Sequence, residues 1–142
     1  GQPGKVFATP GWRVIKDRGS LLIEPVQEAV KPLLEIKEHP YTPDFMIPRN
    51  KATACFDADK LQHPLSLRLC RQGDSFVPFG MKGRKKVSDY LTDRKFSLLR
   101  KERQWVLCCG DDIIWLVGER VDNRFRIDEK TRKVLVVSTI DQ

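Results

Sequence analysis

The sequence predicts a mostly β fold of the α+β class: a small β-rich domain with one inserted amphipathic helix, preceded by a short β-meander. Three observations support this prediction. Short alternating or β-branched apolar runs, separated by turn residues, recur along the 142 residues. One stretch, 84–94, places apolar residues at clear helical spacing without a proline. The composition, 40% hydrophobic, is sufficient for a packed core.

The first 24 residues read as a meander, because two turn sequences separate three short apolar runs. The turns are Thr9-Pro10-Gly11 and Asp17-Arg18-Gly19, both rich in residues that favour chain reversal. The expected strands cover residues 5–8, 12–16 and 20–24.

The segment that follows is ambiguous. Residues 24–38 carry valines and leucines at helical spacing, but Pro32 lies inside this stripe, so helix and extended chain both stay open. Three prolines in 39–49 indicate a connector. We therefore expect a boundary near residue 50, with a β-rich connecting segment at 1–50 and a C-terminal domain at 51–142.

The C-terminal part predicts a succession of strands. In the clearest one, Leu65, Leu67 and Leu69 alternate with polar residues and should share a core face. A Gly-Asp-Asp turn at 110–112 should join two strands as a hairpin. The expected strands cover residues 53–56, 65–69, 104–109, 113–117, 123–127 and 133–137.

The predicted helix, 84–94, follows a loop rich in glycine and basic residues. Val87, Tyr90 and Leu91 should form its apolar face. Cations at a helix N-terminus are unfavourable in isolation, whereas a phosphate there would gain from the free N–H groups. The alternative is a solvated charged surface in which Lys85 pairs with Asp89, but such a pair neutralises only one cation.

The excess charge of the chain is local. The window 82–103 holds nine basic and three acidic residues, a net charge of +6, whereas the whole chain carries +7. A concentrated basic segment favours a polyanionic partner.

Other function classes find little support in the sequence. The four cysteines form no CxxC pair and the two histidines lie far from them, so we predict no metal site. No nucleotide-binding loop or catalytic triad is recognisable. With no apolar run near 18 residues and no signal peptide, we expect a soluble cytoplasmic protein without membrane contact. The opening Gly1-Gln2-Pro3-Gly4 suggests a piece excised from a longer chain.

Residues 73–91, GDSFVPFGMKGRKKVSDYL, resemble the C-terminal domain of the tRNA(Ile)-lysidine synthase family, and the resemblance continues through 114–125. It implies a PheT/TilS-like β-sandwich. The family uses ATP to attach lysine to the wobble cytidine of the isoleucine tRNA with a CAU anticodon, forming lysidine. Its ATP-binding loop belongs to an N-terminal domain that is absent here.

The resemblance implies that the full-length protein is an ATP-dependent ligase, which binds ATP and Mg in the absent domain. It also implies that this chain alone is inactive and holds no cofactor. Its role would be to bind the tRNA, at the acceptor stem, beside the parent catalytic domain. A protein-interaction β-domain that docks the parent's catalytic or partner domain is the alternative; the oligomeric state stays open. The candidate tRNA-binding residues are Arg71, Lys82, Arg84, Lys85, Lys86, Arg94, Lys95, Arg100 and Arg103.

Overall fold

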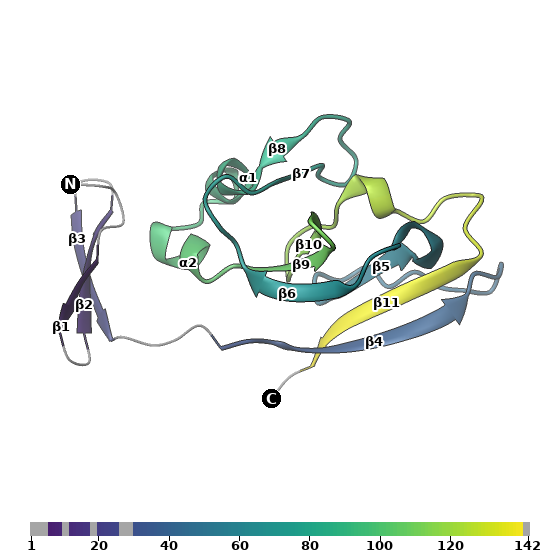
Figure 1. The fold of residues 1–142 in the computed structure, drawn as a ribbon, viewed down its shortest axis with the longest axis horizontal. Coiled ribbons are helices and arrows are strands. Elements are labelled where there is room, and N and C mark those ends of the chain that lie inside the picture. Colours follow the sequence, from purple (N-terminus) through teal and green to yellow (C-terminus); the bar gives the residue numbers. More distant parts are fainter. Residues whose placement is uncertain (1–5, 10–11, 18–19, 26–29, 141–142) are drawn as a thin grey trace.

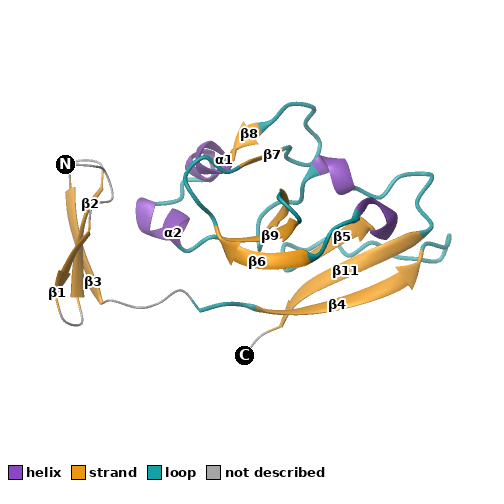
Figure 2. Cartoon of the chain, in the orientation of Figure 1, coloured by secondary structure: helices purple, strands orange, loops and turns teal. Residues whose placement is uncertain are grey.

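The computed structural model describes residues 6–9, 12–17, 20–25 and 30–140 (Figure 1). Strands account for most of the regular structure in this part of the chain, and the helices are short (Figure 2). The predicted α+β class with a predominance of strands is therefore confirmed.

The N-terminal strands form a sheet of their own, in the order β1-β2-β3. Antiparallel pairing sets Thr9 opposite Trp12 and Asp17 opposite Ser20, as expected for two successive hairpins. The predicted meander is confirmed, whereas its turn residues 10–11 and 18–19 lie outside the described residues. The strands are β1 (Val6–Thr9), β2 (Trp12–Asp17) and β3 (Ser20–Pro25).

Two further antiparallel sheets, each of three strands, form the main body of the domain. Their side chains meet in a core that includes Phe56 and Val137 from one sheet and Ile114 and Trp115 from the other. One sheet has the order β4-β11-β5, with β4 (Leu33–Pro40), β11 (Lys133–Ile140) and β5 (Thr53–Asp57). The other has the order β10-β9-β6, with β10 (Asp112–Leu116), β9 (Trp105–Cys109) and β6 (Leu65–Leu69).

A third layer covers the outer face of the β10-β9-β6 sheet. It consists of the helix α1 (Val87–Asp93) and the two-stranded hairpin of β7 (Ser75–Phe76) and β8 (Lys85–Lys86). A second buried cluster joins this layer to the sheet and includes Phe76, Leu91 and Val106. Burial of these apolar side chains fixes the basic hairpin against the rigid sheet.

The ambiguous segment before residue 40 is a strand where the structure describes it. All eight residues of β4 pair with β11, from Leu33 opposite Ile140 to Pro40 opposite Lys133. Pro32 directly precedes this pairing, where its missing N–H removes no ladder hydrogen bond. The helical alternative is thus wrong for 33–38, and the strand continues through residues 39–40, which were predicted to begin the connector. The sheet also joins residues on both sides of the boundary expected near residue 50.

The predicted helix start at residue 84 is wrong. Lys85 and Lys86 belong to β8, where they pair with Phe76 and Ser75. The N–H of Val87 donates to the carbonyl oxygen of Asp74 at 2.9 Å, so this donor serves the hairpin before the helix begins. The result is a helix of seven residues.

Two other local predictions also differ from the structure. A short helix that was not predicted, α2 (Leu98–Glu102), begins where the hydroxyl of Ser97 accepts the N–H of Arg100 at 3.2 Å. The strand predicted at 123–127 is instead a 3₁₀ turn, η2 (Asn123–Phe125), capped by Asp122. A further 3₁₀ turn, η1 (Ala58–Lys60), follows β5.

Candidate nucleic-acid interface

The loop between β7 and β8 carries two of the predicted cations and is anchored at several points. The carboxylate of Asp122 accepts the N–H of Val77 at 2.9 Å. The chain then turns at 78–81, where Gly80 has φ +87°, a conformation suited to glycine at the third position of a type II turn. Because its base is fixed in this way, the loop holds Lys82 and Arg84 on a defined part of the surface.

A partly buried ion pair fixes the turn that leads into this hairpin. The carboxylate of Asp74 accepts hydrogen bonds from the Arg68 guanidinium at 2.8 and 3.1 Å and from the N–H of Arg71 at 2.6 Å. Burial alone would raise the pKa of Asp74, but the hydrogen bonds from Arg68 and Arg71 outweigh it, and the pKa lies below its ordinary value. Asp74 thus links the strand β6 to the basic hairpin.

Most of the predicted cations are available to a ligand. Arg84 donates to the hydroxyl of Ser75 at 3.0 Å, and the guanidinium of Arg100 lies 3.9 Å from the ring centre of Phe96; neither contact removes charge. We use the name "basic surface" for those of the nine predicted cations that are exposed and have no ion pair with a carboxylate among the described residues. These are Arg71, Lys82, Arg84, Lys86, Lys95 and Arg100.

Two predicted cations are neutralised within the fold. Lys85 pairs with Asp93, and not with Asp89 as the spacing suggested. Arg94 pairs with Glu119 at 3.3 Å, although the two residues are far apart in sequence. Arg103, the ninth predicted residue, is partly buried. The charge available on this surface is therefore smaller than the sequence count indicates.

The structure brings Arg71 and Lys86 to one groove of about 600 Å³. The groove runs between the turn at 70–73 and the helices α1 and α2. A third cation, Lys101, also lines it, together with two acidic residues, Asp89 and Glu102. Two cations from separate segments beside a concave surface can hold one anion between them. The other members of the basic surface lie outside this groove.

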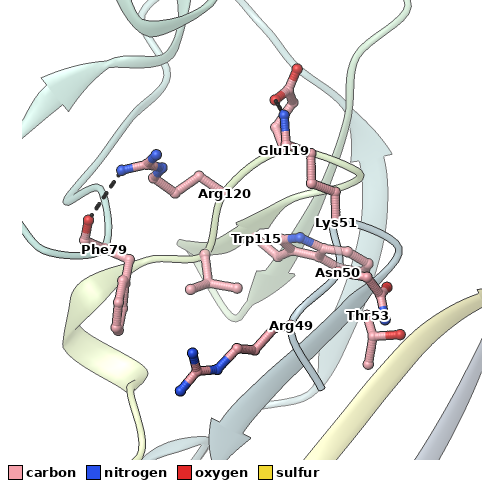
Figure 3. Close-up of a pocket in the computed structure, with 9 residues that line it drawn as sticks. Arg49, Asn50, Lys51, Thr53, Phe79, Trp115, Glu119 and Arg120 are labelled. Carbon is pink, nitrogen blue, oxygen red and sulfur yellow. Dashed lines mark hydrogen bonds and ion pairs between the residues drawn. The ribbon is translucent and has the colours of Figure 1, made fainter. Parts of the chain in front are cut away.

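Sequence reasoning missed a second concave region with basic walls. Arg49, Lys51 and Arg120 line a hollow of about 520 Å³ together with Phe79 (Figure 3). The available signal is the basic Arg49-Asn50-Lys51, which spans the end of the predicted connector at 39–49 and the boundary expected near residue 50. Arg120 lies more than sixty residues away in sequence, so only the fold reveals its proximity.

The described residues offer no group of three or more His, Cys, Asp or Glu side chains that could hold a metal ion. Burial raises the pKa of the Cys55 thiol and is the main cause of the raised pKa values of Cys70 and Cys108, which favours the protonated thiol. In the same part of the chain, every helix is too short or too polar to cross a membrane.

Fold and surface together define a β-sandwich domain that displays unpaired cations on a hairpin-and-helix layer. Residues 65–138 match the family model described as the TilS substrate C-terminal domain. Since this match includes more than half of the chain, the chain belongs to that family.

Two of the most similar relatives are named tRNA(Ile)-lysidine synthase. The chain is 60% identical to the tRNA(Ile)-lysidine synthase of Bacteroides thetaiotaomicron, over 99% of this chain and 34% of that protein. It is 49% identical to the tRNA(Ile)-lysidine synthase of Parabacteroides distasonis, over 96% of this chain and 35% of that protein. The chain thus spans about a third of the length of these relatives.

Two solved structures share the fold. A crystal structure of a TilS C-terminal domain matches with a TM-score of 0.58 and 18% identity, over 98% of this chain and 93% of that one. An N-terminal fragment of the phenylalanyl-tRNA synthetase β-subunit from Pyrococcus horikoshii matches with a TM-score of 0.54 and 19% identity, over 61% of this chain and 27% of that one. The expected PheT/TilS-like β-sandwich is confirmed.

Proposed function

We propose that this chain is the tRNA-binding region of an ATP-dependent ligase that forms lysidine in the cytoplasm. The names of its relatives support this proposal. The parent protein would attach lysine to the wobble cytidine of the isoleucine tRNA with the CAU anticodon. ATP and Mg would bind in the catalytic domain, which this chain lacks, so the chain alone would carry out no ligation.

The observation that carries the proposal is the basic surface. Its six side chains are exposed and lack carboxylate partners among the described residues, so their charge is available to phosphates. Phosphate contacts supply most of the affinity for nucleic acid and fix the position of the protein on it. A double-stranded stem is recognised mainly through phosphates and 2′-hydroxyls, which suits the acceptor stem as the bound element.

The test compares two double variants that remove equal charge. Replacing Arg84 and Lys86 by alanine should weaken binding of the isoleucine tRNA transcript about tenfold or more, since each lost phosphate contact costs on the order of 1 kcal/mol. The matched control replaces Lys130 and Arg132, which are exposed and lie outside the basic surface. Its binding should change much less. Equal losses in filter binding, with both variants folded by circular dichroism, would contradict a positional site.

Docking of the parent catalytic domain remains a second candidate function. It is favoured by the edge strand β4, which leaves Leu33 and Ile36 about half exposed beside the exposed Ile140. Binding through such an apolar edge should respond little to salt, whereas phosphate binding weakens steeply as salt rises. A salt series on the isolated chain with tRNA, and with the separate catalytic domain, distinguishes the two functions.

A further inference from the structure

We propose that the hollow between Arg49, Phe79 and Arg120 binds an unpaired nucleotide of the RNA. The base would stack on the Phe79 ring, and the attached phosphate would lie against the cations. This inference rests on the proposed function, because it requires an RNA ligand, but it concerns a site separate from the basic surface. The inference predicts that the domain binds an unpaired nucleotide in addition to a double-stranded stem.

The hollow has the size and the lining of a small-ligand site. Its volume, about 520 Å³, falls within the range of roughly 300–1,000 Å³ found for such pockets. The buried Trp115 contributes to its wall, and Asn50 and Thr53 add polar groups (Figure 3). An amide and a hydroxyl can pair with donors or acceptors on the edge of a base.

Phe79 is exposed yet held in place by its backbone. The residue is 49% exposed, which is unusual for a phenylalanine. Its N–H donates to the carbonyl oxygen of Val121 at 3.0 Å, and its own carbonyl oxygen accepts from Arg120 at 3.4 Å. The turn at Gly80 completes the anchoring. An exposed aromatic side chain on an anchored stretch of backbone offers a stacking platform whose main chain needs little ordering on binding.

The charge of the hollow favours an anion. Arg49 has no carboxylate partner among the described residues, and its side chain extends into the hollow (Figure 3). The one acidic side chain in the wall, Glu119, is already compensated by Arg94 at 3.3 Å and Lys51 at 4.0 Å. A phosphate would therefore meet a net positive wall, which strengthens an otherwise sequence-tolerant stacking contact.

The shape favours an unpaired nucleotide over a duplex. Bases inside a duplex are stacked on their neighbours, and their faces are not accessible to a protein ring. An unstacked base presents both faces and can enter a concave site. Such a nucleotide could come from a 3′ end, a 5′ end or a loop, and the chemistry of the hollow is the same for each source.

The experiment uses RNA hairpins with one stem sequence and either a blunt end, a 3′ overhang or a 5′ overhang. The wild-type chain should bind at least one overhang hairpin more tightly than the blunt one. Phe79→Ala should weaken binding of that hairpin about tenfold, the effect typical of a lost base–aromatic stack, and leave blunt binding unchanged. Phe79→Trp should restore most of the loss. The overhang that responds identifies the source of the nucleotide.

Two matched controls define the outcome. Met81→Ala removes an exposed apolar side chain from the same loop but outside the hollow, and should have no effect on either RNA. Arg49→Gln should weaken overhang binding, whereas Arg132→Gln should not. The inference is overturned if Phe79→Ala weakens all hairpins equally or none. The proposed function is tested separately, because replacing Arg84 and Lys86 should weaken blunt and overhang hairpins alike.

Discussion

Asp122 and Arg124 are joined by two side-chain hydrogen bonds of 3.0 Å each, although the Asp122 side chain is completely buried. The same carboxylate accepts the N–H of Val77 at 2.9 Å and the N–H of Arg124 at 2.8 Å. A buried carboxylate is stable when its hydrogen-bonding capacity is satisfied in this way. Asp122 thus connects the start of the loop between β7 and β8 to the turn η2, which lies about 45 residues later in the chain.

Asp122→Ala should destabilise the fold strongly. It leaves a partly buried guanidinium without its main partner and a buried N–H at Val77 without an acceptor. Breaking a buried ion pair from one side typically costs about 3–5 kcal/mol. Urea denaturation followed by circular dichroism measures the change in the free energy of unfolding.

The control for this prediction is Asp112→Ala, which removes the other carboxylate near Arg124. Asp112 is about half exposed and lies 3.4 Å from the guanidinium. Exposed pairs contribute roughly 0–1 kcal/mol, so this variant should remain close to wild type. Similar losses in both variants would show that Arg124, and not the burial of Asp122, determines the stability of this region.

Asp74 predicts a dependence of stability on pH. Its folded-state pKa is lowered, so the carboxylate stabilises the fold at pH values above its unfolded pKa of about 4. This contribution is lost as the pH falls through the lowered folded-state pKa. Asp74→Asn should therefore cost on the order of 1 kcal/mol near neutral pH and progressively less in acid.

Urea denaturation of wild type and Asp74→Asn at several pH values measures this effect. Asp111→Asn, an exposed residue in the β9–β10 turn, serves as the control. A difference between wild type and Asp74→Asn that stays constant from neutral to acidic pH would show that hydrogen bonding, and not ionisation of the carboxyl, accounts for the loss.

The number of phosphate contacts should appear in the salt dependence of tRNA binding. If about four to six cations of the basic surface contact phosphates, the logarithm of the binding constant should fall against the logarithm of salt concentration with a slope of roughly −3 to −5. Loss of Arg84 and Lys86 should make this slope shallower by about 1.4 to 1.8. A filter-binding series measures it, and a slope near zero in the wild-type chain would rule out a phosphate-binding surface.

The strands with a clear period of two could be predicted from sequence. Leu65, Leu67 and Leu69 alternate with polar residues, and the segment is a strand at the predicted position. All three are partly buried, and Leu65 and Leu67 pack against the core. Such predictions succeed because successive side chains of a strand point to opposite faces, so alternation of apolar and polar residues identifies the core face without knowledge of distant contacts.

The failures occurred where distant residues determine the local structure. The start of α1 depends on a hydrogen bond from Val87 to the carbonyl oxygen of Asp74, which no helical pattern contains. The neutralisation of Arg94 depends on Glu119, brought close only by packing. The 3₁₀ turn at 123–125 is capped by Asp122, whose carboxylate is held in place by the N–H of Val77, 45 residues earlier in the chain. Charge and propensity counted along the sequence cannot include these contacts.

The pairing of β4 with β11 along all eight residues has a consequence for how this domain can be exchanged between proteins. A transplanted segment that began after residue 50 would leave β11 with one bare edge, and unpaired strand edges recruit other chains. The smallest segment that can be transferred with this sheet intact therefore includes Leu33–Pro40, which lies outside the matched family segment at 65–138. Gene fusion or recombination that separated β4 from β11 would expose a strand edge that the intact fold covers.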